Sequence, residues 1–362
     1  MILDCSRIVS LHSGLGRFTL AVLAALRDMG IEPELVVGCD GFPGAKVMTP
    51  VFLRTRSKVS VLKPLAWMLY ARFGFACKPD QPMLSVMHNV VPRSRNQVVT
   101  VHDLRPCFFP DNPIQAYYWR HILPRSLRKA KAIVTVSQTS KAKICSVYGI
   151  APEKIHVVTN CFVPTETVAE DELERMPRLL CVGGNWRHKN IHELLEMHEL
   201  WRDRYQVDIV MAKTAYLEML RELVTRLGLE ELVCFHHGVP DKRLREMYQS
   251  SAALVYPSLD EGFGIPPLEA MSYGLPVIAS DIPVFRELFS TAPLYISVGS
   301  RESWKQAFER LESDEQVCCH MKTGREVVQR FTPESLRRQL ADMVSAVWPE
   351  SMGLATNDRR GE

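Results

Sequence analysis

The chain has 362 residues, of which 46% are hydrophobic, and this is enough for about two domains with cores of their own. Its ten cysteines include no CxxC pair, and no signal-peptide pattern opens the sequence, so no zinc site is apparent and a reduced, cytoplasmic setting is expected. Residues 1–165 hold 21 Lys and Arg against 9 Asp and Glu (+12), while the remainder holds 23 against 32 (−9), which sums to the net charge of +3.

The opening segment predicts a strand, a glycine-containing loop and a helix. Residues 1–9 are strand-like, and apolar residues recur at three- and four-residue spacing from 15 to 29. A loop of this kind before a helix can hold a phosphate, which makes Gly16 a candidate phosphate contact. A dinucleotide fingerprint needs a third small residue where Thr19 stands, but Asp40 lies near the distance expected of a ribose carboxylate. A nicotinamide-dependent enzyme therefore stays open as an alternative.

The segment 41–80 mixes basic and apolar side chains and is the least readable part of the chain. Residues 61–77 are too short and too charged to span a bilayer. Their composition fits an amphipathic helix at a membrane surface, and equally a core helix whose cationic side chains extend to solvent. Because the first half carries +12 and no nucleic-acid motif, we expect it to meet an anionic membrane or a lipid-pyrophosphate acceptor, with a solvated basic surface as the alternative.

Two histidines follow predicted strands in the first half. Strands are expected at 84–87 and 97–101, with His88 after the first and His102-Asp103 after the second. Open α/β sheets bind ligands at the carboxyl ends of their strands, so these side chains are candidate ligand contacts, although a lone histidine is often structural. The remaining elements expected here are a helix at 117–131, a strand at 132–136, a helix capped by Ser137 and a strand at 155–159.

A polar, acidic stretch at 163–178 predicts a linker, after which a second series of strands and helices begins. A strand at 178–182 leads through two glycines to Arg187 and Lys189 at a helix start. Glycines followed by cations suit a diphosphate, because the cations stabilise oxyanion charge. An ordinary charged helix start is the alternative. Further strands are expected at 207–212, 232–235 and 295–298, with helices at 242–249, 303–311 and 332–347.

The most informative stretch is residues 252–279. It predicts a buried strand at 252–256, a glycine-containing loop, a helix at 268–273 opened by two prolines, and a second strand from 276. Glu261 falls in the loop and Glu269 in the first turn of the helix. The free N–H groups of a helix start favour a phosphate, so the stretch predicts a nucleotide-diphosphate site with two carboxylates around it.

This stretch resembles the E-x7-E signature of the retaining glycosyltransferases of family 4, which have the GT-B fold. Glu261 and Glu269 match the two glutamates, with Gly262-Phe263-Gly264 between them. The sequence Gly14-Leu15-Gly16-Arg17-Phe18 is similar to the G-I-G-R-Y start of mannosyltransferase-like members, and His102-Asp103 and Lys189 also match family motifs. The chain departs from the family at Gly184, where an arginine is common and for which Arg187 is the candidate replacement.

The resemblance implies an α/β chain of two doubly wound Rossmann-like domains that face a central cleft. Residues 1–165 would bind the acceptor and residues 175–330 the nucleotide sugar. A terminal helix at 331–349 would cross back to the first domain, and residues 350–362 would form a disordered tail.

The resemblance also implies roles for individual residues. Glu269 would bind the ribose hydroxyls of the donor, and Glu261 would contact its sugar ring. Lys189, with Arg187, would stabilise the departing diphosphate, and His102 would bind the sugar near the reacting carbon. The remaining residues implied by the resemblance would contact the donor at Gly16, Gly262, Phe263 and Gly264 and the acceptor at His88 and Asp103. Asp103 would also orient its segment.

The implied activity is the retaining transfer of a hexose, with mannose from GDP-mannose favoured, to a glycan or lipid-linked acceptor. Its setting would be bacterial surface-polysaccharide synthesis, either lipopolysaccharide O antigen or exopolysaccharide. No D-x-D pair occurs in the sequence, so we expect no metal cofactor. The expected location is the cytoplasm or the inner face of the cytoplasmic membrane. A catalytically inactive nucleotide-sugar-binding module and the nicotinamide-dependent enzyme are the alternatives.

Overall fold

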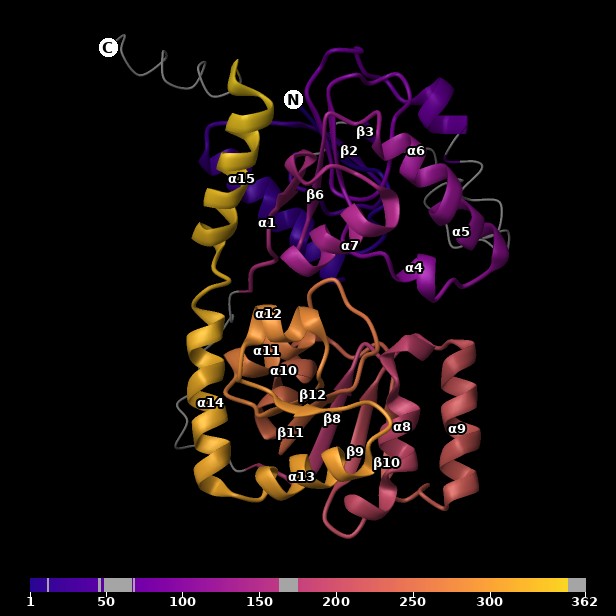
Figure 1. The fold of residues 1–362 in the computed structure, drawn as a ribbon, viewed down its shortest axis with the longest axis vertical. Coiled ribbons are helices and arrows are strands. Elements are labelled where there is room, and N and C mark those ends of the chain that lie inside the picture. Colours follow the sequence, from indigo (N-terminus) through magenta and orange to yellow (C-terminus); the bar gives the residue numbers. More distant parts are fainter. Residues whose placement is uncertain (12, 45–46, 49–66, 68, 163–174, 351–362) are drawn as a thin grey trace. The chain divides into compact units, whose positions relative to one another are not determined.

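The chain forms two α/β units in a computed structural model that describes residues 1–350 except 12, 45–46, 49–66, 68 and 163–174 (Figure 1). Unit 1 consists of Met1–Cys161 together with Pro333–Glu362, and unit 2 of Phe162–Thr332. Most of the predicted linker, residues 61–66 of the predicted amphipathic segment and the tail 351–362 lie outside the described residues. Within the described part of the chain, no helix is long and apolar enough to cross a membrane.

Unit 1 is built on a parallel sheet whose strands run in the order β3-β2-β1-β4-β5-β6-β7. The order reverses between β1 and β4, and in such sheets the crevice at the carboxyl ends of the strands at this point binds ligands. Leu3 pairs with Leu35 on one side and Leu84 on the other, and all three side chains are buried. The strands are β1 (Ile2–Cys5), β2 (Glu34–Val37), β3 (Val47–Met48), β4 (Met83–Ser85), β5 (Gln97–Thr100), β6 (Ala132–Thr135) and β7 (Ile155–Val157).

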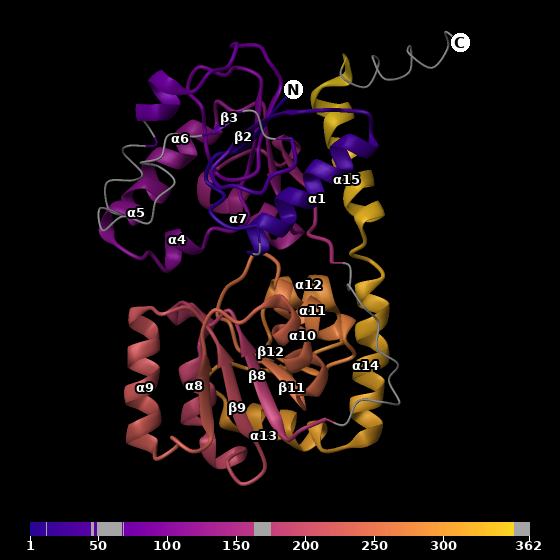
Figure 2. The same ribbon diagram turned by 180° about the vertical axis from the view of Figure 1, so that it is seen from behind.

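Helices cover this sheet, and two of them begin at serine caps, of which the one at Ser137 was predicted. Ser13 accepts a hydrogen bond from the Gly16 amide, and Ser137 accepts one from the Ser140 amide. Helix α15 lies beside α1, as Figures 1 and 2 both show. The helices are α1 (Gly14–Asp28), α4 (Arg105–Phe108), α5 (Pro113–Tyr117), α6 (Leu123–Leu127), α7 (Gln138–Tyr148) and α15 (Pro333–Val347).

Two sequence expectations in unit 1 were wrong in their extent. The first strand ends at Cys5 rather than residue 9, because the Ser6 amide turns back to the Asp4 carboxylate at 3.0 Å and the Ile8 amide donates to Cys5 O. The single helix expected at 117–131 is divided into the end of α5, a π-helical turn and α6. Pro124 lies in the first turn of α6, where its missing N–H is tolerated, so the helical register changes just before it.

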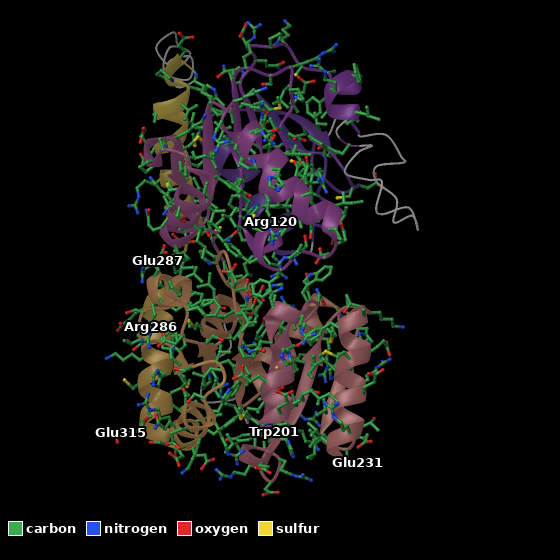
Figure 3. All side chains as sticks on the ribbon, turned by 45° about the vertical axis from the view of Figure 1, so that its right-hand side comes forward. Arg120, Trp201, Glu231, Arg286, Glu287 and Glu315 are labelled. Atoms are coloured by element: carbon green, nitrogen blue, oxygen red, sulfur yellow. The ribbon has the colours of Figure 1, made fainter. Side chains whose placement is uncertain are left out.

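Unit 2 is also built on a parallel sheet, whose strands run in the order β10-β9-β8-β11-β12-β13. The order reverses between β8 and β11. Trp201, labelled in Figure 3, is fully buried in its core and donates through Nε1 to Leu194 O at 2.8 Å. The prediction of two doubly wound α/β units is therefore confirmed. The strands are β8 (Arg178–Val182), β9 (Gln206–Val210), β10 (Val233–His236), β11 (Ala253–Tyr256), β12 (Val277–Ser280) and β13 (Leu294–Ile296).

Three helices of unit 2 were not predicted from the sequence pattern: α9, α12 and α14. Helix α14 packs on α11, where Gly324 lies against Met271. The helices are α8 (Ile191–Glu196), α9 (Ala215–Leu227), α10 (Asp241–Ser250), α11 (Ile265–Ser272), α12 (Pro283–Phe289), α13 (Arg301–Leu311) and α14 (Asp314–Val328), with a 3₁₀ turn at Arg187–Lys189.

Candidate functional site

The loop between β11 and α11 ends at a glycine that no other residue can replace without strain. Gly264 caps α11 with φ of 102°, and a Cβ added there would lie 2.8 Å from the Phe285 ring. Because the chain turns at Gly264, α11 begins at Ile265, three residues earlier than predicted. Glu269 therefore lies in the second turn of the helix, and its expected position in the first turn was wrong.

The carboxylate of Glu261 and the ammonium of Lys189 form an ion pair in this loop, with 12% and 15% of their side chains exposed. Lys189 Nζ also donates to the Tyr256 hydroxyl at 2.7 Å and lies 4.9 Å from the centre of the Tyr256 ring. Burial alone lowers the pKa of Lys189, but the Glu261 carboxylate outweighs it and the pKa is raised. Burial alone raises the pKa of Glu261, but Lys189 reverses this and the pKa is lowered. Both groups are therefore charged at neutral pH.

Two further contacts fix the segment that carries Lys189. The Leu259 amide donates to His188 O at 2.8 Å, which ties the loop after β11 to the turn before α8. The buried Glu193 carboxylate accepts hydrogen bonds from the Gly299 amide at 2.7 Å and from Trp304 Nε1 at 2.8 Å. Sequence reasoning missed both Tyr256 and Glu193, because their partners are distant in sequence and no motif marks them.

Glu269 is held by a different set of contacts in the interior of unit 2. Only 5% of the residue is exposed, and its Oε2 accepts a hydrogen bond from the Tyr248 hydroxyl at 2.8 Å. Tyr248 comes from α10 and stacks on Tyr273, with ring centres 5.8 Å apart. A buried carboxylate that is oriented by a phenol hydroxyl is suited to accept hydrogen bonds from ligand hydroxyl groups.

The remaining predicted donor contacts differ in how their side chains are used. Phe263 is 4% exposed and its ring packs on Phe289 and Phe331, so a donor could meet only its backbone. Arg187 lies exposed in the 3₁₀ turn beside Lys189. Gly184 is buried, and a Cβ there would lie 2.1 Å from Ile191 Cδ1, which explains why no arginine stands at this position.

His102 lies at the carboxyl end of β5 in unit 1, as predicted. Its Nε2 donates to Val86 O at 2.9 Å, since a carbonyl can only accept. Its ring is nearly perpendicular to that of Phe18, with ring centres 4.9 Å apart. Burial lowers the pKa of His102 to about 4, so the ring is neutral at pH 7 and Nδ1 is an acceptor. The neighbouring Asp103 accepts from the Arg105 amide at 2.9 Å and so orients the start of α4.

His88 and His102 belong to one group of side chains at the ends of adjacent strands. Burial, Arg7 and His102 together hold the pKa of His88 well below its usual value. The His88 ring lies 4.6 Å from the ring of Trp119. Arg7, which follows β1, was not anticipated from the sequence, because the turn that brings it into this group is set by Asp4.

Close packing of the backbone explains why position 16 is a glycine. A Cβ at this position would lie 2.3 Å from Ser10 O and 2.5 Å from Leu11 Cα, so the missing side chain makes room for backbone. Its amide donates to Ser13 Oγ at 3.1 Å and is therefore already used. The contact of Gly16 with a donor or acceptor stays a prediction, as do the roles of the other site residues.

Comparison with known proteins gives consistent matches over both units. The profile named "Glycosyl transferases group 1" matches residues 162–326, and the one named "Glycosyltransferase Family 4" matches residues 12–166. The O-antigen chain mannosyltransferase RfbU of Salmonella typhimurium is 36% identical over 327 residues, which cover 86% of this chain and 91% of that protein. The O-antigen chain mannosyltransferase B of Escherichia coli is 30% identical over 221 residues, or 56% of this chain and 57% of that protein.

A solved structure matches over nearly the whole chain. The crystal structure of WaaG, a glycosyltransferase involved in lipopolysaccharide biosynthesis, superimposes with a TM-score of 0.73 and covers 95% of this chain and 100% of its own. The sequence identity is 16%, so this match concerns the fold alone.

Proposed function

This chain belongs to the family 4 glycosyltransferases and has their GT-B fold, and from this premise we propose that it transfers mannose from a nucleoside-diphosphate sugar, with GDP-mannose favoured. The acceptor would be a glycan or lipid-linked glycan in bacterial O-antigen or other surface-polysaccharide assembly. Two relatives named O-antigen chain mannosyltransferases support this choice, one of them along 91% of its length. Membership of the family sets the nicotinamide-dependent alternative aside.

The ion pair of Lys189 with Glu261 is the observation that carries the proposal. An ammonium group has three N–H donors, and in the described part of the chain Tyr256 and Glu261 accept two of them. The third is left for an oxygen of the departing diphosphate, whose charge grows as the bond to the sugar breaks. Glu261 then lies beside the cation that holds the diphosphate, where it would bind the sugar ring.

The rest of the proposal assigns binding and stereochemistry. Glu269, oriented by Tyr248, would accept hydrogen bonds from the ribose hydroxyls of the donor. Arg187 would add charge next to Lys189, and His102 would offer Nδ1 to a sugar hydroxyl. Transfer would retain the anomeric configuration and need no metal, since Lys189 supplies the charge that a divalent cation supplies elsewhere.

Turnover of a donor panel by the purified chain tests the proposal. With a lipid-linked glycan acceptor, GDP-mannose should be used at least tenfold faster than UDP-glucose or UDP-galactose, and nuclear magnetic resonance of the product should show the donor's own anomeric configuration. A chelator should leave the rate unchanged. Turnover of a different sugar would refute the mannose assignment, and absence of turnover with any donor would favour the inactive binding module.

A peripheral position on an anionic membrane is proposed for unit 1. Five of its large apolar side chains are more than half exposed in segments that also carry arginines: Leu69, Phe73, Phe108, Ile114 and Tyr117. Each cation near such a surface contributes about 1 kcal/mol, screened by salt. Co-sedimentation should be stronger with vesicles containing phosphatidylglycerol than with phosphatidylcholine alone and should weaken with salt. Equal binding to both vesicles would contradict the electrostatic part.

A further inference from the structure

Arg7 is a charged side chain of unit 1 to which the proposed function assigns no role. It lies two residues after the end of β1 and is half-buried. Among the described residues no oxygen accepts a hydrogen bond from its guanidinium, and Tyr118 and Asp4 act on it through space. Burial lowers the Arg7 pKa, but a guanidinium remains protonated in proteins. A partly desolvated cation without a hydrogen-bonded partner is unfavourable, which points to a ligand that completes its shell.

The surroundings of Arg7 come from three neighbouring strands. β1, β4 and β5 are adjacent in the sheet, and Arg7, His88 and His102 each follow the carboxyl end of one of them. The rings of His88 and Tyr118 lie 6.3 Å apart, centre to centre, and Arg7 and His102 follow the strands on either side of β4. Both imidazoles are neutral at pH 7 because burial lowers their pKa values, and a neutral imidazole can still donate one N–H.

Asp4, the carboxylate that acts on Arg7 through space, is held by hydrogen bonds to other groups. Asp4 is completely buried, and its oxygens accept from the Ser6 amide at 3.0 Å and from Ser85 Oγ at 2.9 Å. Burial raises the pKa of Asp4, which shows that its charged form is disfavoured. Arg7 lies in the unit that also holds the excess of Lys and Arg.

We propose that Arg7, with His88 and the Tyr118 hydroxyl, forms a phosphate-class anion site in unit 1. The planar fork of an arginine matches two oxygens of a phosphate or pyrophosphate group, and the other two side chains add neutral donors. The group would be supplied by a lipid-pyrophosphate acceptor or by the donor. Naming these two sources rests on the proposed function, whereas the anion site itself does not.

Calorimetry of the full chain tests this site with inorganic pyrophosphate as the probe, in protein already saturated with GDP. Arg7→Gln should weaken pyrophosphate binding at least tenfold, and Arg7→Lys should restore part of it, because it keeps the charge without the fork. Arg95→Gln is the matched control, because it removes one exposed positive charge next to the amino end of β5, whereas Arg7 lies beyond the carboxyl end of β1. This variant should bind pyrophosphate like the wild type. Thermal denaturation of each variant confirms folding.

A GDP titration without pyrophosphate identifies the source. Weaker GDP binding by Arg7→Gln assigns the anion to the donor, and unchanged GDP binding with lost pyrophosphate binding assigns it to the acceptor. The site is refuted if folded Arg7→Gln weakens neither pyrophosphate binding nor GDP binding, or if Arg95→Gln weakens them as much as Arg7→Gln does. If Arg7→Gln does not fold, Tyr118→Phe is measured in its place. Severalfold weaker pyrophosphate binding by Tyr118→Phe would support the site, and unchanged binding would refute it. A wild type that neither binds GDP nor transfers mannose would refute the proposed function alone.

Discussion

At the scale of single residues, two glutamates eight positions apart have different environments. Glu261 is paired with a lysine, whereas Glu269 is buried against a tyrosine hydroxyl. Loss of a contact to a part of the donor that does not react raises KM with little change in kcat, whereas loss of a contact at the reacting sugar lowers kcat. The two environments therefore predict separable kinetic effects.

Glu269→Gln should weaken binding of bare GDP about ten- to hundredfold, because hydrogen bonds to a charged group contribute roughly 1.5–3 kcal/mol. Glu261→Gln should leave GDP binding within severalfold of wild type, since Lys189 keeps its charge, and should lower kcat about 10²-fold by misplacing the sugar. Calorimetry with GDP and steady-state kinetics measure the two effects. The opposite pattern would reverse the assignment, and no effect in either variant would place the donor elsewhere.

His102 makes the stability of unit 1 depend on pH. Its folded pKa of about 4 lies below the usual value near 6.5, so between these pH values the unfolded chain binds a proton that the folded chain does not. The stability that the neutral ring contributes is present above pH 6.5 and is lost as the pH falls toward 4. At pH 5 the loss amounts to about 2 kcal/mol.

Urea unfolding at pH 7 and pH 5 measures this effect. His102→Gln should reduce the loss of stability between the two pH values, because the amide does not titrate. A residual loss is expected, since the pKa of His88 is also lowered by burial. Equal pH dependence of wild type and variant would show that His102 is not the group responsible.

The sequence predicted the chemistry of these residues better than their contacts. Glu261 and Lys189 were both expected near a diphosphate, but their direct pairing brings together residues 72 positions apart. Tyr256 and Arg7 went unrecognised, because a tyrosine at a strand end and an arginine in a short turn resemble ordinary core and surface residues. Their importance depends on what the fold places beside them.

At the scale of elements, the strands were predicted well because a parallel sheet buried on both faces needs runs of apolar residues. Helix starts were predicted less well. The prolines at the start of α11 suggested a helix from residue 268, but the conformation of Gly264 starts it at Ile265. The helix expected at 117–131 is interrupted ahead of Pro124, and this interruption depends on packing that the local pattern does not contain.

Gly264→Ala should therefore destabilise the chain more than an alanine at an ordinary left-handed glycine. The left-handed conformation costs about 1–2 kcal/mol for a residue with a Cβ, and forcing that atom against Phe285 adds roughly 1–3 kcal/mol. Gly228→Ala in the same unit is the control, because φ is +65° there and a Cβ would meet nothing within 4 Å. Urea unfolding compares the two variants. Equal losses would mean that the loop relaxes around the added methyl group.

At the scale of the whole molecule, sequence order and structural units do not coincide. α15 follows unit 2 in the chain but contacts α1 of unit 1. The amide and hydroxyl of Thr159 donate to Gln339 at 2.8 and 3.0 Å, and Trp348 Nε1 donates to Asn96 at 2.7 Å. The side chain of Leu340 lies with Phe18 and Val22 in the interior of unit 1.

Leu340→Ala should accordingly destabilise unit 1, although the residue belongs to the last helix of the chain. Leu340 is 1% exposed, and truncation of a buried leucine costs about 2–5 kcal/mol. Hydrogen exchange read by mass spectrometry should show faster exchange in β1 and α1 and unchanged exchange in β8 and β9. Leu220→Ala, at a fully buried leucine of α9, should give the reverse pattern. If Leu340→Ala loosened β8 and β9 as much as β1, the two units would unfold as one, and stability in this enzyme would be shared along the whole chain.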